Sequence, residues 1–512
     1  MRRLLAGAVL GVVAIATLPA AATVSCVGGR QTSDPLSPVC VPSFTGDNGG
    51  ATWDGVTATS IETVLYNDLG ITGSLNSPWA ATDEATGHSL DPTGTSTNLL
   101  RTAKALVAYF NSRYQTYGRT VRVTAFPSSL GETSICAARY SDAVDAIETY
   151  QPFALTMLGM GHGCAFDATE DASILGVGHA EETRDAHVGD GRAAFTFAPT
   201  IEQTTNAAAG FICRSLWGRP ASHAGGQLRG LSPRRFGLIY PSPGQSWFAE
   251  NAALLGAAMH ARCGASFALT KTYRNGQPGD LVQHIQAARA WPISSLVCLC
   301  PAENGDARAA IAAARALNYE PEWIWMPATR MDRATWQRLA GDPIGSHFGV
   351  SPTWLAPAPD QQEAMRAARE ADPGLSPNAR ATTDLFLALR MLFTAIQQAG
   401  PTLTPATATT GLEALSITSI APDAVQGSFN DPGRRSWTDT FVAWWFDPSA
   451  SPPGEALPRG CIRLMRDGRR FTADDWPSGD VELFAGGRCS GLLRSQPTDT
   501  PVDYAISIVG PE

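Results

Sequence analysis

The side chains that could bind a small molecule stand just after predicted β-strands. In an open α/β sheet, ligands bind beyond the carboxyl ends of the strands, where a few polar groups meet apolar walls. Five segments hold such positions, at 159–164, 178–183, 241–247, 301–305 and 327–330. We expect a ligand site built from these segments and the strand ends beside them, namely His162, His179, Glu181, Ser242, Gln245, Trp247, Glu303 and Trp325.

Each of these residues also has an ordinary structural explanation. A loop histidine such as His162 or His179 is more often held by a backbone hydrogen bond than by a ligand. Glu181 could complement the dipole of a helix N-terminus. Trp247 could pack against the protein, and Gln245 could only shape a turn. The ligand site is therefore a hypothesis that rests on the positions of these residues.

A metal site is the sharper alternative. The donors would be His162, Cys164, His179, Asp185 and His187, whose types suit zinc. Their spacing matches no compact zinc motif, and the cysteine is better assigned to a disulfide. We therefore predict no bound metal.

The chain contains no recognisable catalytic or cofactor motif. A nucleotide P-loop needs a Gly-Lys pair, and neither Lys104 nor Lys271 follows a glycine. The segment GQSWF at 244–248 lacks the closing glycine of a GxSxG nucleophile elbow. We predict no catalytic residue, no cofactor and no enzymatic activity.

Two series of alternating strands and helices must position these loops. After a first strand with Ile61, Val64 and Leu65, one series runs from a helix near residue 97 to a strand at 173–177. The other begins at FGLIY, 236–240, and reaches a strand at 322–326. Repeated βα units predict an α/β fold with parallel sheets and helices on both faces.

Length and composition bound the class of protein. A chain of 512 residues exceeds the size at which single cores stop growing, so we expect two or more folding units. The net charge of −9 argues against a nucleic acid or an anionic membrane surface as partner. Only two of the 38 basic residues are lysines, which suggests a GC-rich genome such as that of an actinobacterium.

The N-terminus has the pattern of a signal peptide. Arg2 and Arg3 precede an apolar run at 4–18, and small residues then lead to a cleavage site after Ala22. The run is shorter than the ~20 apolar residues of a membrane-spanning helix. Lipidation at Cys26 is the less favoured alternative, because Thr23 stands where a lipoprotein signal usually has leucine.

Ten cysteines in an exported chain indicate disulfides. Pairing between near neighbours predicts Cys26–Cys40, Cys136–Cys164, Cys213–Cys263 and Cys461–Cys489. Cys298 and Cys300 lie two apart on a predicted strand, where their separation of ~6–7 Å would prevent an unstrained bond. We interpret them as buried thiols rather than as a redox pair.

Several segments, in order and spacing, resemble the type I periplasmic-binding class, the group similar to branched-chain amino-acid-binding proteins. They are GDNGGATWDGVT at 46–57, GRTVRV at 118–123, RRFGLIY at 234–240, LNYEPEWIW at 317–325, GSFNDPG at 427–433 and DGRRFTADDWP at 467–477. The resemblance implies two Rossmann-like lobes with parallel sheets, between which the chain crosses three times, near 200, 350 and 430.

The implied organisation has five parts. They are a signal peptide at 1–22, a cysteine-containing segment at 23–52, lobe 1 at 53–200 plus 353–426, lobe 2 at 201–352 plus 427–448, and a Pro/Gly-rich tail at 449–512.

The resemblance implies a secreted or cell-envelope solute-binding protein without enzymatic activity. We expect a monomer that binds a small-molecule solute between its lobes and delivers it to the membrane permease of an ABC transporter. The alternative is a secreted sensory or interaction domain of the same fold. Recognition of amino acids does not carry over, because the loops MGHG at 160–163 and MPATR at 326–330 lack the hydroxyl pair and the acid that the family uses.

Overall fold

The computed structural model describes most of the chain from Cys26 to Gly479 and two short stretches beyond it. The described residues are 26–33, 37–77, 79, 95–128, 136–159, 163–180, 183–242, 246–274, 277–300, 306–326, 346–352, 362–377, 379–419, 427–429, 433–449, 461–479, 489–490 and 504–505.

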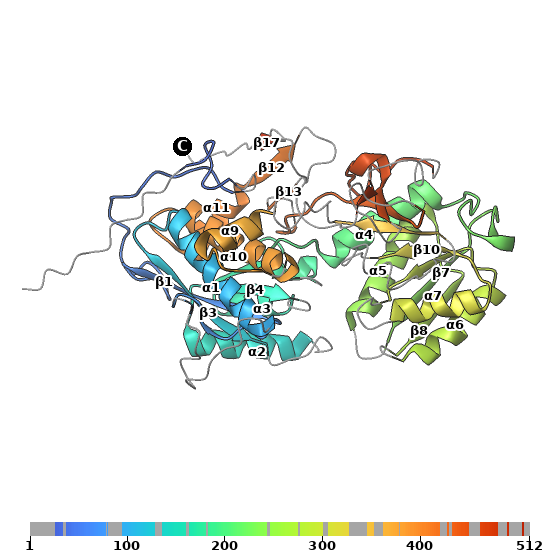
Figure 1. Ribbon diagram of the computed structural model, residues 1–512, viewed down its shortest axis with the longest axis horizontal. Helices are drawn as coiled ribbons and strands as arrows, with labels where there is room; N and C mark the ends of the chain where they lie inside the picture. The colour runs from blue at the N-terminus through green and yellow to red at the C-terminus, as the bar shows by residue number, and fades with distance from the viewer. Residues whose placement is uncertain are drawn as a thin grey trace, which may run out of the picture.

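The first sheet, which forms lobe 1, has the strand order β2-β3-β1-β4-β5-β6 (Figure 1). Its strands are β1 (Ser60–Asn67), β2 (Gly73–Ser74), β3 (Thr120–Pro127), β4 (Ala154–Gly159), β5 (Leu175–Ala180) and β6 (Ala194–Thr196). Neighbouring strands are parallel except β2 and β3. Its helices are α1 (Thr95–Arg113), α2 (Cys136–Tyr150), α3 (Ala165–Asp171), α9 (Glu363–Ala371), α10 (Ala379–Ala399) and α11 (Pro405–Glu413).

Helices cover both faces of this sheet because successive side chains of β1 point to opposite sides. Ile61 and Leu65 join the core shared with α1, α9, α10 and α11. Val64 and Tyr66 join the core shared with α2 and α3. Gly55 lets the chain before β1 pass close to the backbone of Phe153, since a Cβ at residue 55 would lie 2.3 Å from the Phe153 nitrogen.

The second sheet, which forms lobe 2, has the order β16-β15-β14-β11-β10-β9-β7-β8. Its strands are β7 (Phe236–Pro241), β8 (Leu269–Tyr273), β9 (Ser295–Cys298), β10 (Glu322–Trp325), β11 (His347–Ser351), β14 (Val442–Asp447), β15 (Cys461–Leu464) and β16 (Cys489–Ser490). The strands from β7 to β11 are parallel, and β14, β15 and β16 add antiparallel strands at one edge. Part of the predicted tail therefore belongs to this sheet, which the sequence did not indicate.

Lobe 2 also has helices on both faces. They are α4 (Ile201–Phe211), continued by a π-helical turn at Ile212–Leu216, α5 (Ser246–Cys263), α6 (Pro278–Ala290) and α7 (Asp306–Ala316). Leu238 of β7 packs in the core with α4 and α5, and the next residue, Ile239, packs in the core with α6 and α7. A small third sheet joins β12 (Ser416–Ser419), β13 (Gly427–Ser428) and β17 (Tyr504–Ala505).

The chain passes between the two sheets three times, as predicted, after β6, after β11 and before β14. The first and third crossings run side by side, because Thr196 N–H donates to Arg435 O at 3.0 Å and Trp437 N–H donates to Thr196 O at 2.9 Å. The rings of Phe197 and Trp437 stack with centroids 6.0 Å apart. The α/β architecture with two lobes is confirmed. The residue boundaries of the lobes stay predictions.

Three of the four predicted disulfides are present, Cys26–Cys40, Cys136–Cys164 and Cys213–Cys263. The prediction for Cys461–Cys489 concerns side chains outside the described residues. The interpretation of Cys298 and Cys300 as thiols was wrong, because they form a disulfide. Strand β9 ends at Cys298, so the backbone is no longer fully extended and the two Cα atoms lie 5.1 Å apart.

Candidate functional site

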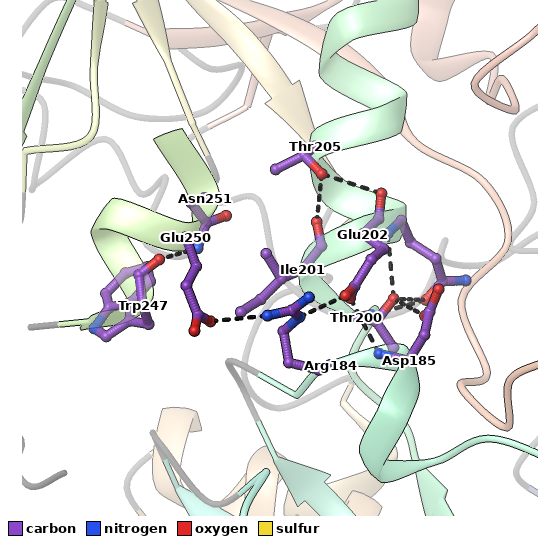
Figure 2. Close-up of polar contacts among 10 residues, drawn as sticks. Arg184, Asp185, Thr200, Ile201, Glu202, Thr205, Trp247, Glu250 and Asn251 are labelled. Atoms are coloured by element: carbon purple, nitrogen blue, oxygen red, sulfur yellow. Dashed lines mark hydrogen bonds and ion pairs between the residues drawn. The ribbon is translucent and has the colours of Figure 1, made fainter. Parts of the chain in front are cut away.

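A polar contact connects the carboxyl edges of the two sheets. Arg184 follows β5 in lobe 1, and Glu250 lies near the start of α5, directly after β7 in lobe 2. The Nη1 atom of Arg184 lies 3.2 Å from Oε2 of Glu250 (Figure 2). Because these residues follow the strands of different lobes, the edges where α/β sheets bind ligands face each other here.

Arg184 is also held at the first crossing. Its Nε donates to Oε1 of Glu202 at 2.5 Å, and Oε2 of the same carboxylate accepts from Asp185 N–H at 3.1 Å. The hydrogen bond to Glu202 is the main reason why the pKa of Arg184 is raised. The guanidinium therefore stays charged between two carboxylates, one from α4 and one from α5 (Figure 2).

The start of α4 explains why these groups converge. Thr200 caps the helix by accepting from Gln203 N–H at 3.2 Å, and Thr200 N–H donates back to the Gln203 side chain at 2.8 Å. The Thr200 hydroxyl also donates to Asp185 Oδ1 at 2.6 Å. Burial raises the pKa of Asp185, and this hydrogen bond offsets part of the effect.

Trp247 and Ser242, both predicted as ligand contacts, lie at this edge of lobe 2 and are half-buried. Trp247 stacks on Phe248 with ring centroids 3.5 Å apart, and its backbone oxygen accepts from the Asn251 amide at 2.9 Å. Ser242 N–H donates to Tyr273 O at 2.6 Å, which ties the end of β7 to the end of β8. Part of each side chain remains accessible to a ligand.

Trp325 has a different environment. Its side chain is buried in the lobe 2 core, and its indole Nε1 donates to Nδ1 of His347 at 3.2 Å. It stacks in line with Trp323 and His347. This packing favours the structural explanation for Trp325, and its role as a ligand contact stays a prediction.

Other predicted site residues fall outside the described part of the chain. They are His162, Glu181, Gln245 and Glu303. His179 is described only in its backbone, which pairs with Leu158 of β4 near the carboxyl end of β5. Their roles as ligand contacts stay predictions.

The structure adds polar residues at the carboxyl ends of β1 and β3. Arg139 Nη1 donates to Asp68 Oδ1 at 2.7 Å and to Ser128 Oγ at 2.9 Å. Arg139 is almost fully buried, whereas the Asp68 side chain is 19% exposed. The sequence signal was present, because Asp68 and Ser128 each directly follow a strand.

Tyr66 extends this cluster beneath the edge. Its hydroxyl donates to Asp142 Oδ2 at 2.8 Å and lies 3.2 Å from Ser128 Oγ. Burial raises the pKa of Tyr66 to about 12, so the phenol stays neutral at ordinary pH. The cluster therefore combines an ion pair, Arg139 with Asp68, and a neutral phenol that donates to Asp142.

The alternative metal site finds no support among the described residues, where no group of three or more His, Cys, Asp or Glu side chains could hold an ion. Cys164 is bonded to Cys136. His187 lies with its Nδ1 3.1 Å from Oδ2 of Asp167, whose other oxygen accepts from Arg192 at 2.6 Å. These two members of the proposed set therefore have other partners.

Comparison with known proteins gives a consistent result. A family model described as "periplasmic binding protein" matches residues 92–443. A fatty acid ABC transporter substrate-binding protein from Thermomonospora curvata is similar in structure, with a TM-score of 0.54, 11% identity and coverage of 85% of this chain and 99% of that chain. A search of curated proteins finds no match.

Two further solved structures have the same fold. A solute-binding protein of an ABC transporter from R. palustris, in complex with 4-hydroxybenzoate, has a TM-score of 0.53 and 11% identity over 83% of this chain and 100% of its own. A leucine-, isoleucine-, valine-, threonine- and alanine-binding protein from Brucella ovis has a TM-score of 0.54 and 10% identity over 82% of this chain and 98% of its own. At these identities the likeness establishes the fold alone.

Proposed function

This chain belongs to the periplasmic binding protein family, and we propose that it is an extracytoplasmic solute-binding protein that closes two lobes over a small polar molecule. The observation that carries the proposal is the contact of Arg184 with Glu250, which lies between the carboxyl edges of the two sheets, the edges at which α/β sheets bind ligands. A permease of an ABC transporter would then bind the closed form and accept the solute.

We propose a small organic molecule with a carboxylate as the solute. The similar proteins named above are described with fatty acids, 4-hydroxybenzoate, or leucine, isoleucine, valine, threonine and alanine, which share this group. In this chain Trp247 offers a half-buried indole for an apolar or aromatic body. Ser242 and Ser128 offer hydroxyl groups at the facing edges of the two lobes.

Closure of the two lobes over a solute, without a chemical reaction, is the simplest activity for this arrangement. Solute-binding proteins of two lobes close by rotation at a few residues of the connecting segments. In this chain Arg184 of lobe 1 forms ion pairs with two carboxylates of lobe 2, Glu202 and Glu250. We propose no catalytic step and no cofactor.

The N-terminus bears on how the protein is retained outside the cell. Periplasmic-binding-protein family members are extracytoplasmic. No helix in the described part of the chain combines the length and the apolar character that crossing a membrane requires. The sulfur of Cys26 is bonded to that of Cys40, so it is not available for a lipid thioether. This supports a mature chain without a lipid anchor at Cys26.

The test is to purify the mature chain from its own host and record native mass spectra before and after denaturation. A co-purified small molecule that leaves only on denaturation supports the proposal and identifies the solute. If the chain is empty, thermal shift against leucine, 4-hydroxybenzoate and a short fatty acid follows. An empty chain whose melting temperature none of these carboxylates changes would contradict the proposed solute class.

A matched pair of variants locates the site. Trp247→Ala should weaken binding of the identified solute at least about tenfold, because an aromatic wall is lost. Trp291→Ala is the control, since Trp291 follows the end of α6, is 55% exposed and lies at the opposite edge of the lobe 2 sheet. Equal effects of the two variants would place the solute elsewhere.

A further inference from the structure

The C-terminal segment 470–478, which we call the C-terminal brace, contacts the lobe 2 ends of the second and third crossings and the far end of α4. It lies beyond residue 443, where the match to the family model ends. In Figure 1 it belongs to the red part of the chain beside α4. The proposed solute site does not use it.

Arg470 joins the second and third crossings. Its Nε donates to the hydroxyl of Thr440 at 2.9 Å, and its Nη2 donates to the backbone oxygen of Thr440 and, at 2.6 Å, to that of Pro352. Pro352 is the first residue after β11, and Thr440 comes just before β14. Arg470 is buried, so these acceptors take the place of water around its charge.

The residues after Arg470 make further contacts with lobe 2. Phe471 and Phe441 exchange two backbone hydrogen bonds of 2.8 Å. Trp476 is fully buried, and its ring centroid lies 5.3 Å from that of Phe211 at the end of α4. Phe211 is the last residue of α4, so this contact fixes the end of that helix that lies away from the first crossing.

The fit between the C-terminal brace and α4 is close. Arg214 Nε donates to Trp476 O at 2.5 Å, and Ser215 Oγ donates to Pro477 O at 2.9 Å. Gly210 of α4 has no side chain to separate the two, and a Cβ there would lie 2.0 Å from Ala473 O. Alanine is the better helix former, so a glycine at this position is consistent with the close approach of the Ala473 backbone to α4.

We propose that the C-terminal brace sets the inter-lobe hinge, with Arg470 as its positioning residue. Lobe rotation is absorbed by a few residues between anchored ends. At the lobe 1 side, Phe197 and Trp437 anchor the first and third crossings by stacking. With Thr440 anchored at the lobe 2 side, bending of these two crossings is confined to the short stretches 198–199 and 438–439. The inference goes beyond solute binding, because it concerns how far and about which residues the lobes rotate.

Arginine suits this position better than lysine. Its guanidinium presents donors in a fixed planar fork, so that one group can bind acceptors on two separate segments. The neighbouring Arg469 is exposed, and its described contact is with the ring of Phe471, 5.5 Å away. Arg469 therefore provides a matched control of the same type, one residue away.

The test measures inter-lobe distances in the full mature chain by single-molecule energy transfer, with dyes at the exposed positions Arg122 of lobe 1 and Trp291 of lobe 2. We expect Arg470→Ala to broaden the distance distribution, Arg470→Lys to broaden it less, and Arg469→Ala to leave it unchanged. Gly210→Ala should reproduce the broadening without removing a charge. No solute is needed, so a failure of this inference would leave the proposed solute binding standing.

Hydrogen exchange separates a hinge role from a general role in folding. In Arg470→Ala, amides at 438–441 should exchange at least about tenfold faster, because buried hydrogen bonds to a charged group are lost. Amides of β4 and β9, inside the two sheets, should keep their rates. Two outcomes would overturn the inference: an unchanged distance distribution in Arg470→Ala, or faster exchange that extends equally through β9.

Discussion

Arg184 and Glu250 form an ion pair between the two lobes, with Nη1 and Oε2 3.2 Å apart, while Arg184 keeps a second carboxylate, Glu202, at the first crossing. Glu202 lies in the first turn of α4, next to the first crossing, so we expect rotation of the lobes to change this pair less than the pair with Glu250. The pair with Glu250 spans the facing edges, so its length depends on how far the lobes are open. It therefore reports and stabilises the lobe arrangement described above.

Glu250→Gln should shift the lobes away from this arrangement. Both side chains are partly exposed, 33% and 44%, so we expect an effect of at most about 1 kcal/mol on the equilibrium, reduced by salt. The measurement is the inter-lobe distance distribution at low and high ionic strength. The control is Glu170→Gln, which removes a similarly exposed pair with Arg192, 26% and 45%, inside lobe 1. A shift in the control as large as that in Glu250→Gln would rule out a specific inter-lobe effect.

Gln203, in the first turn of α4, should be sensitive to truncation because it links the first and third crossings. Its buried amide accepts from Thr200 N–H at 2.8 Å and from the Ser436 hydroxyl, and it donates to Thr438 O at 2.8 Å. Gln203→Ala leaves these buried partners unsatisfied and should lower the free energy of unfolding by about 1–3 kcal/mol. Urea unfolding measures this. Gln286→Ala, at an exposed position of α6, should change little, and equal losses would contradict the assignment.

Glu322→Gln should be strongly destabilising. Glu322 and Arg234 are both fully buried, with Nε and Oε2 2.8 Å apart, and Ser295 and the His223 backbone N–H also donate to this carboxylate. Neutralising the acid leaves a buried guanidinium without its counter-charge, at a cost of roughly 3–5 kcal/mol. Urea unfolding is again the measurement. Asp280→Asn, which removes the exposed pair with Arg274, is the control and should have no measurable effect.

Asp372 should contribute stability that depends on pH. Two hydrogen bonds from Arg101, at 2.5 and 2.7 Å, hold the pKa of Asp372 below its ordinary value of 3.8. Because the folded pKa is the lower one, this stability is present above pH 3.8 and is lost as pH falls through the folded pKa. Asp372→Asn should therefore cost about 1 kcal/mol near pH 7.

The measurement for Asp372 is the free energy of unfolding of wild type and variant as a function of pH. The difference between them should shrink in the acid range, where the wild-type carboxylate is protonated. Asp474→Asn, with a side chain 83% exposed, is the control. A difference for Asp372→Asn that stays constant down to the acid range would contradict this origin of the stability.

The local patterns of the sequence determined the elements and the class of fold. Alternating strands such as FGLIY and helices with apolar residues at helical spacing are encoded by neighbouring residues, so each could be predicted separately. The succession of βα units was enough to predict parallel sheets. Three disulfides between near neighbours followed from the same local information.

Only the tertiary structure decided which side chains of distant elements contact one another. The pairing of Arg184 with Glu250 and the burial of Trp325 against His347 depend on how strands far apart in the chain come to lie, and no local pattern encodes that. The bond between Cys298 and Cys300 depended on where β9 ends, which periodicity does not specify to the residue. Arg470 resembles its neighbour Arg469 in sequence, and only the fold makes one a buried donor to two crossings and leaves the other exposed.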